Sequence, residues 1–154
     1  MSACRGTGAD SVGDPALIGA WRSSVEFETG TFASAEGFEF MYTFNAGGTM
    51  TESSNYDAAP PVPPAYGVWR QVGPRRFEAC YEFFSTRAAT PAEAEKASGG
   101  WLPGGRGVLM ETIDLAEDGE SFTSSLRYEL FDATDKPLEG GGSGAGRGKR
   151  IGFR

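Results

Sequence analysis

The sequence contains no histidine among its 154 residues. This absence excludes Ser-His-Asp and Cys-His catalysis, zinc sites of the usual histidine-rich kinds and a histidine-ligated haem. Any acid–base chemistry must therefore come from Asp, Glu, Tyr, Lys or Cys side chains. We expect neither a cofactor nor a metal site.

Cysteine is also scarce. The chain has two, Cys4 near its start and Cys80 in a predicted strand. Two cysteines do not build a disulfide framework. We therefore expect both thiols to be free, with Cys80 serving as a small packing residue.

Long apolar runs are missing as well. No stretch approaches the length of a membrane span. The start of the chain, MSACRGTGADSVGDP, lacks the hydrophobic core of a secretory signal. The sequence as given predicts a cytoplasmic protein, or a secreted one if a signal peptide has been removed from it.

Basic residues are outnumbered by acidic ones. The net charge is -7, and four of the 14 basic residues lie in the segment 139–154. The rest of the chain is strongly acidic, which argues against nucleic acid as a partner. The segments GGRG (104–107) and GSGAGRG (142–148) do not lie between a strand and a helix, so they do not indicate nucleotide binding. We expect a small molecule as the partner, and a monomer or homodimer.

Alternation of apolar and polar residues is plentiful. Phe38, Phe40, Tyr42 and Phe44 occupy every second position, and the turn formers NAGG follow at 45–48. Similar hairpin signals recur along the chain, and 23 glycines and nine prolines disfavour long helices. The pattern predicts eight strands, near 19–28, 37–45, 48–55, 65–72, 75–87, 105–115, 120–131 and 139–152.

Sequential hairpins of this kind predict an all-β fold, an eight-stranded antiparallel up-and-down barrel with one short helix in a loop. We expect a flexible N-terminal segment at 1–16 and a single barrel domain at 17–154. The helix is predicted at 91–97, with Thr90 as its N-cap. A meander would place the proline-rich loop 56–65 and the loop 89–105 over the same mouth of the barrel.

The final segment, EGGGSGAGRGKRIGFR, allows two interpretations. Its glycines and serines are typical of a flexible tail. Its end, however, returns to the apolar residues Ile151 and Phe153. We predict a closing strand at 139–152, in which glycine permits sharp bending against the first strand. A flexible tail remains the alternative.

The order of several short motifs resembles the calycin superfamily, in particular a bacterial lipocalin-like group. Lipocalins carry Gly-x-Trp in the first strand, matched by Gly19-Ala20-Trp21, and a basic residue late in the last strand. The motifs YTFNAGGT, ESSN, YGVW and GKRIGF follow in order, so the resemblance covers most of residues 17–153. It implies a calycin-like barrel in which Arg150, or Arg147, packs across Trp21 as a structural pair.

The resemblance also implies a function, the binding of a small hydrophobic or aromatic molecule inside the barrel. The aromatic faces of the predicted strands would line the cavity, with Trp101 and the proline-rich loop over its mouth. The same rings can equally form a core that fills the barrel, which would then act only through its surface. The predicted ligand-binding residues are Phe40, Tyr42, Phe44, Tyr66, Trp69, Tyr81, Phe83, Trp101, Leu126 and Tyr128.

The strand acids are candidates of a different kind. Glu111 shares a predicted face with Leu109 and Ile113, and Glu52 shares one with Met50. A glutamate that points inward would have a raised pKa and the capacity for acid–base chemistry. For each strand acid, a solvated position on the outer face is the alternative.

A cofactor-free enzyme is the second functional hypothesis. Small antiparallel barrels such as the allene oxide cyclase-like and spirotetronate-cyclase groups restrain a flexible apolar substrate while a tyrosine or acid polarises a carbonyl. Such a cyclase, isomerase or lyase would need no histidine, metal or nucleotide. Its catalytic candidates are Tyr42, Tyr66, Tyr81, Tyr128 and Glu111.

Overall fold

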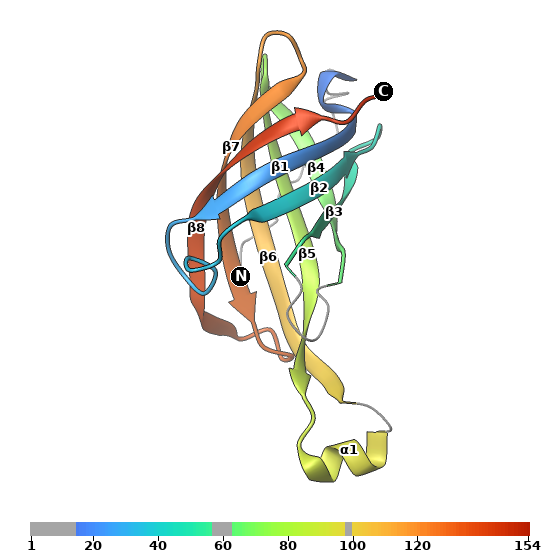
Figure 1. Ribbon diagram of the computed structural model, residues 1–154, viewed down its shortest axis with the longest axis vertical. Helices are drawn as coiled ribbons and strands as arrows, with labels where there is room; N and C mark the ends of the chain where they lie inside the picture. The colour runs from blue at the N-terminus through green and yellow to red at the C-terminus, as the bar shows by residue number, and fades with distance from the viewer. Residues whose placement is uncertain (1–14, 57–62, 98–99) are drawn as a thin grey trace.

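The protein is a closed barrel of eight antiparallel strands joined in chain order (Figure 1). The computed structural model describes residues 15–56, 63–97 and 100–154. Its elements are η1 (Pro15–Leu17), β1 (Gly19–Phe27), β2 (Phe38–Phe44), β3 (Thr49–Ser54), β4 (Ala65–Gly73), β5 (Arg76–Ala88), α1 (Pro91–Ala97), β6 (Trp101–Leu115), β7 (Ser121–Phe131) and β8 (Pro137–Arg150).

The predicted fold class is confirmed, and so is the nature of the last segment. Strand β8 pairs with β1 from Trp21↔Arg150 to Phe27↔Gly144, and with β7 on its other side. Glycine is required here because neighbouring groups come very close. A Cβ on Gly144 would lie 2.3 Å from the carbonyl oxygen of Glu26. The glycine-rich segment therefore closes the barrel.

Alternation along the strands decides which side chains fill the barrel. In β2 the even-numbered residues Phe38, Phe40, Tyr42 and Phe44 are buried, and the residues between them are exposed. The other strands contribute inward faces in the same way. The core that results is dominated by aromatic rings in contact with one another.

One end of the barrel, the sealed end, carries η1 and the turns 45–48, 74–75 and 116–120. There the Trp21 indole donates a 2.9 Å hydrogen bond to the carbonyl oxygen of Leu17. The Arg150 guanidinium lies 4.2 Å from the centre of the Trp21 ring. It also donates hydrogen bonds to the carbonyl oxygens of Ala16, Ile18 and Gly119. Arg150, rather than the exposed Arg147, is thus the residue over Trp21.

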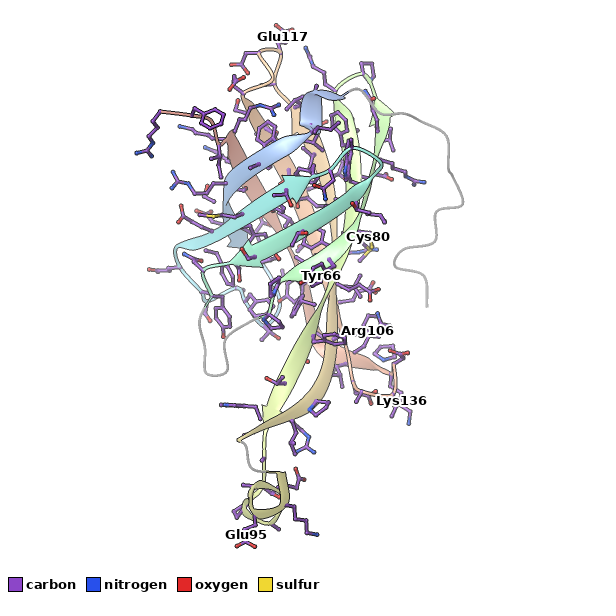
Figure 2. All side chains as sticks on the ribbon, turned by 90° about the vertical axis from the view of Figure 1, so that its right-hand side faces the viewer. Tyr66, Cys80, Glu95, Arg106, Glu117 and Lys136 are labelled. Carbon is purple, nitrogen blue, oxygen red and sulfur yellow. The ribbon has the colours of Figure 1, made fainter. Side chains whose placement is uncertain are left out.

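The opposite end, the arm end, carries the loop 28–37, the turn 132–136 and a projecting ribbon of β5 and β6. Figure 1 shows this ribbon running beyond the barrel, with α1 at its tip, and Figure 2 places Glu95 of α1 far from Glu117 at the sealed end. The predicted helix 91–97 is confirmed. The Thr90 hydroxyl accepts a 3.3 Å hydrogen bond from the backbone N–H of Glu93, as an N-cap does.

The ribbon corrects the expectation that the segment 89–105 lies over the mouth. Strand β6 begins at Trp101, which pairs with Ala88, so the hairpin is longer than the sequence pattern suggests. The Trp101 side chain is 45% exposed on this ribbon. The register of the β5–β6 pairing shifts between Ser85 and Thr86, within this ribbon. Of the other expected lid, 56–65, residues 57–62 lie outside the described residues.

The free-thiol expectation for Cys80 is wrong, because Cys80 is disulfide-bonded. Strand parity places this residue on the outer face of β5, since Ala79 and Tyr81 face the core. The other cysteine of the sequence, Cys4, lies outside the described residues, as does most of the predicted flexible segment 1–16.

Among the described residues, no helix combines the length and the apolar character needed to cross a membrane.

Candidate functional site

Two carboxyl groups and two phenols meet inside the barrel. We call Tyr42, Glu52, Tyr81 and Glu111 the carboxyl cluster. They come from β2, β3, β5 and β6, and each lies on the inward face of its strand. The register brings them together, since Tyr42 pairs directly with Glu52 across the β2–β3 ladder. Four strands therefore converge on one polar spot in an otherwise aromatic interior.

Glu111 is held in place by the phenols. The Tyr81 hydroxyl donates a 2.8 Å hydrogen bond to Oε2 of Glu111, and the Tyr42 hydroxyl lies 3.4 Å from Oε1. The Glu111 side chain is only 2% exposed. Both phenols are also fully enclosed, so water does not compete for these bonds. Glu111 is thus a fixed acceptor whose two oxygens each face a donor.

Glu52 differs because one of its oxygens lacks a donor. It is 5% exposed, and its Oε1 atom is buried without a hydrogen bond. Burying a polar atom in this way costs about 1–3 kcal/mol in proteins, and more if the group is charged. A buried oxygen of this kind inside a barrel is available to accept a hydrogen bond from a bound molecule.

Burial changes the acidity of the whole cluster. It raises the pKa of Glu52 from 4.5 to about 8, and the negative charge of Glu111 contributes further. Burial also raises the pKa of Glu111, although the hydroxyls of Ser124, Tyr81 and Tyr42 oppose this rise. The pKa values of Tyr42 and Tyr81 lie well above 10.0, mainly through burial. Near neutral pH, Glu52 therefore carries a proton.

The cluster contains no positive charge. Within the part of the chain that the structure describes, the buried polar or charged side chains are Ser23, Glu52, Glu111 and Ser124. No lysine or arginine is among them. Nor do those described residues contain a group of three or more His, Cys, Asp or Glu side chains suited to holding a metal ion.

Aromatic rings and small side chains surround the cluster. The Tyr42 ring stacks on Phe44 at 5.5 Å and meets Phe40 edge-on at 5.9 Å between centroids. The register sets Ala65 opposite Glu52 and Ala79 opposite Glu111. Methyl groups at these positions leave little bulk on one side of each carboxyl, while Tyr42 stands beside Glu52 and Leu126 beside Glu111 on the other side.

The loop 28–37 closes the arm end through an aromatic plug, which consists of Phe27, Phe32, Phe38, Tyr56 and Tyr128. The Phe32 and Tyr128 rings lie 5.0 Å apart, and the Tyr128 hydroxyl accepts a 3.1 Å hydrogen bond from the backbone N–H of Phe32. Tyr128 was a predicted catalytic and binding residue. Its hydroxyl serves the plug, and it makes no hydrogen bond to the carboxyl cluster.

The structure separates the remaining predicted residues into several environments. Phe40, Phe44 and Leu126 are buried in the interior around the cluster, and Leu126 pairs with Glu111 across the β6–β7 ladder. Trp69 is buried toward the sealed end, where its indole donates a 3.1 Å hydrogen bond to the carbonyl oxygen of Asn45. Trp101 lies on the projecting ribbon, away from the cluster.

Tyr66 departs from the expectation that it faces the interior. It is 65% exposed on the outer face of β4 (Figure 2). The physical reason is strand parity, because Tyr66 and Trp69 are three residues apart and a strand cannot turn both inward. Tyr66 instead borders an external pocket of about 340 Å³, together with Phe83, Phe84 and Arg106.

Glu52 is the site residue that sequence reasoning weighed but did not select. The signal was present, since Glu52 lies two positions after the apolar Met50 on an alternating strand. The sequence does not indicate, however, that one carboxyl oxygen of Glu52 is buried without a hydrogen-bond donor. Phe32 was missed entirely, because it lies in a loop that shows no periodic pattern.

No family model, curated protein or solved structure matches the chain. The site is therefore defined by its own geometry, which is that of a small closed barrel with paired acids and phenols at its centre.

Proposed function

We propose that the barrel binds a small, largely apolar or aromatic molecule in its interior, with the polar group of that molecule directed at the carboxyl cluster. The observation that carries the proposal is the buried Oε1 atom of Glu52, which has no hydrogen-bond partner. A purely structural core would gain stability from a methionine or leucine at this position. A ligand that donates a hydrogen bond there offsets the cost of burial.

The two ends of the barrel support one direction of entry. The sealed end is fastened by Arg150, whose hydrogen bonds join η1, Ile18 just before β1, and the 116–120 turn. The arm end is closed by the loop that carries Phe32, a partly buried residue packed against the core. We infer that the ligand enters at the arm end when this loop moves, because loops open at lower free energy than paired strands.

The resemblance to calycins is consistent with this proposal. Proteins of that group use the interior of an eight-stranded barrel for small ligands, and the pairing of Trp21 with a late basic residue is the feature on which the resemblance depends. The relationship to that superfamily remains a proposal, and it rests on the motif order and on the 4.2 Å approach of Arg150 to Trp21.

The test uses three probes that share one ring and one two-carbon linker: 2-phenylethanol, 2-phenylethylamine and 3-phenylpropanoate. Each is titrated into isotopically labelled protein while the amide signals are followed by NMR. We expect at least one probe to shift the amides of β3 and β6 that carry Glu52 and Glu111. If none of the three shifts these signals at millimolar concentration, the proposal is wrong.

A matched pair of variants separates the interior from the surface. Glu52→Met fills the space at the cluster and removes the acceptor, so it should abolish binding. Glu78→Met makes the same change on the partly exposed face of β5 and should leave binding unchanged. Equal binding by the two variants would place the ligand outside the barrel.

One observation favours an enzymatic alternative. Glu52, whose pKa is raised to about 8, places an acid that is protonated at neutral pH beside the hydrogen-bonded Tyr81–Glu111 pair. We propose, as the second candidate, a cofactor-free enzyme in which this acid polarises a carbonyl of an apolar substrate. Turnover of conjugated carbonyl compounds or polyenes would test it, and Glu52→Gln should then lower kcat more than it raises KM.

A further inference from the structure

The interior holds two carboxyl groups and no positive charge to match them. Among the described residues, Glu52 and Glu111 are the only buried carboxyl side chains, and no arginine or lysine is buried. Buried carboxylates in proteins are normally paired with a cation or hold a metal. In the free protein Glu52 is neutral near pH 7 because it holds a proton, and any cation that replaces this proton has to come from outside the chain.

We propose that the interior site takes an organic ammonium ion, a small amine attached to an aromatic or apolar group. This inference rests on the proposed function, because it names the chemical class of the molecule bound inside the barrel. The carboxyl cluster receives the ammonium head, and the rings that surround it receive the apolar body.

The hydrogen-bond geometry fits an ammonium better than a neutral donor. Both oxygens of Glu111 already face phenols, at 2.8 Å from Tyr81 and 3.4 Å from Tyr42. A carboxylate oxygen accepts more than one hydrogen bond, so Glu111 retains acceptor capacity. The Oε1 atom of Glu52 is wholly unused. An ammonium group has three donors and can satisfy both acids, whereas a single hydroxyl donates one hydrogen bond.

The walls of the cluster suit a cation as well. Four rings stand around or within it, those of Phe40, Tyr42, Phe44 and Tyr81, and the Tyr42 and Tyr81 rings meet edge-on at 6.2 Å. The faces of aromatic rings attract cations, by about 2 kcal/mol or more when water is excluded. An anionic ligand would instead meet two acids without a compensating base.

A bare metal ion fits less well. Two glutamates provide the only carboxylate ligands in the cluster, and no larger group of His, Cys, Asp or Glu side chains suited to a metal occurs among the described residues. Calcium and magnesium require about six oxygen ligands, several of them charged or water. The predominantly aromatic surroundings do not provide these ligands.

Proton release gives the inference a signature of its own. Glu52 is faced by Glu111 from β6, by Tyr42 from β2 and by Tyr81 from β5, and its negative charge is disfavoured first by burial and then by the charge of Glu111. An ammonium beside it would favour that charge, so binding near neutral pH should expel a proton from Glu52. As the pH is raised toward the pKa of Glu52, the affinity for the amine should therefore increase by up to about tenfold per pH unit.

The experiment is calorimetry on the full chain with 2-phenylethylamine, 2-phenylethanol and 3-phenylpropanoate near pH 7. We expect the amine to bind at least about tenfold more tightly than the alcohol, with no detectable binding of the carboxylate. Repeating the amine titration in two buffers with different heats of ionisation counts the protons. Close to one proton should be released per amine bound.

Glu52→Gln keeps the size of the side chain and removes its charge. It should lower the affinity for the amine about tenfold or more, abolish proton release and leave the affinity for the alcohol nearly unchanged. Glu78→Gln, which removes a carboxylate from the outer side of β5, is the matched control and should change none of these values.

The outcomes separate the ammonium inference from the proposed function. If the alcohol binds as tightly as the amine and no proton is released, the ammonium inference is overturned while the proposed function stands. If none of the three probes binds, both are overturned. Should Glu52→Gln fail to fold, the ranking of the probes and the proton count on the unaltered protein still decide the question.

Discussion

The Tyr81 hydroxyl donates a 2.8 Å hydrogen bond to Oε2 of Glu111 in the closed interior of the barrel, 30 residues away along the chain. This bond ties β5 to β6 through side chains at a level where their backbones are already paired. It also orients the Glu111 carboxyl toward the rest of the cluster. Removing the phenol hydroxyl should therefore weaken the fold.

Tyr81→Phe should destabilise the protein by about 1–3 kcal/mol, because it leaves a buried carboxyl oxygen without its donor. Tyr42→Phe should cost less, since its hydroxyl lies 3.4 Å from Glu111 rather than 2.8 Å. Urea unfolding of the two variants provides the measurement. A larger loss for Tyr42→Phe than for Tyr81→Phe would contradict the assigned geometry.

The stability of the protein should fall as pH rises through the range in which Glu52 titrates. Folding raises its pKa from 4.5 to about 8, so between these values the folded state holds a proton that the unfolded chain has released. The free energy of unfolding then decreases by up to about 1.4 kcal/mol per pH unit. The upward shift of Glu111 acts in the same direction.

Urea unfolding at several pH values across this window measures the slope, and Glu52→Gln should make it shallower. Asp114 and Asp132 do not interfere, because their pKa values are lowered from 3.8 and their effect falls at more acidic pH. A slope of the opposite sign, or one that Glu52→Gln leaves unchanged, would show that Glu52 is charged in the folded state.

Glu52→Met should raise the stability near neutral pH while it removes ligand binding. Replacing a buried ionisable group by an apolar side chain of similar volume is often stabilising by about 1–4 kcal/mol. The effect should grow toward high pH, where Glu52 is forced to ionise. Thermal unfolding measures the change in stability, and the NMR titration measures the loss of binding. A strongly destabilised Glu52→Met would indicate a structural role for the carboxyl.

Arg150→Ala should cost about 2–4 kcal/mol, because it removes a cation from the face of Trp21 together with hydrogen bonds to three buried or partly buried carbonyls. Arg147→Ala, three residues earlier on β8, is the control. Its side chain is exposed, and its loss should change the stability by less than about 0.5 kcal/mol. Similar melting temperatures for the two variants would show that the sealed end is fastened by other contacts.

Much of the fold was predictable because its signals are local. The alternation in β2 and the turn formers at 45–48 specify a hairpin without reference to the rest of the chain. Strand β8 was harder, because glycine carries no side-chain pattern. Its prediction depended on the apolar residues Ile151 and Phe153 and on the first strand, and both ladders of β8 confirm it.

The ribbon was not predictable in the same way. The segment WLPGG, 101–105, has the composition of a loop, yet it pairs with β5. Gly104 permits this pairing, since a Cβ there would lie 2.9 Å from the backbone carbonyl carbon of Thr86 on β5. Gly105 permits the close approach of β7, since a Cβ there would lie 2.1 Å from the carbonyl oxygen of Phe131. Such contacts join segments that are distant in the sequence, so they cannot be predicted from the composition of the segment itself.

The site was predicted in part. Tyr42 and Tyr81 were selected for their hydroxyls and Glu111 from parity, and the three meet in the structure. Tyr66 and Tyr128 were selected for their hydroxyls as well, but Tyr66 lies on the outer face, and Tyr128, although buried, belongs to the plug. Which strands face one another across a barrel depends on its closure and stagger, and local sequence carries little of that information.

The lining of the barrel is unevenly distributed among its strands. Along β8 the inward positions are glycines, and a methyl group on Gly146 would lie 2.6 Å from the Ser124 hydroxyl, while one on Gly148 would lie 2.2 Å from the Phe122 ring. This strand has no room to vary. Substitutions that change which molecules fit inside the barrel must therefore lie on the other seven strands, because the inward positions of β8 accept only glycine.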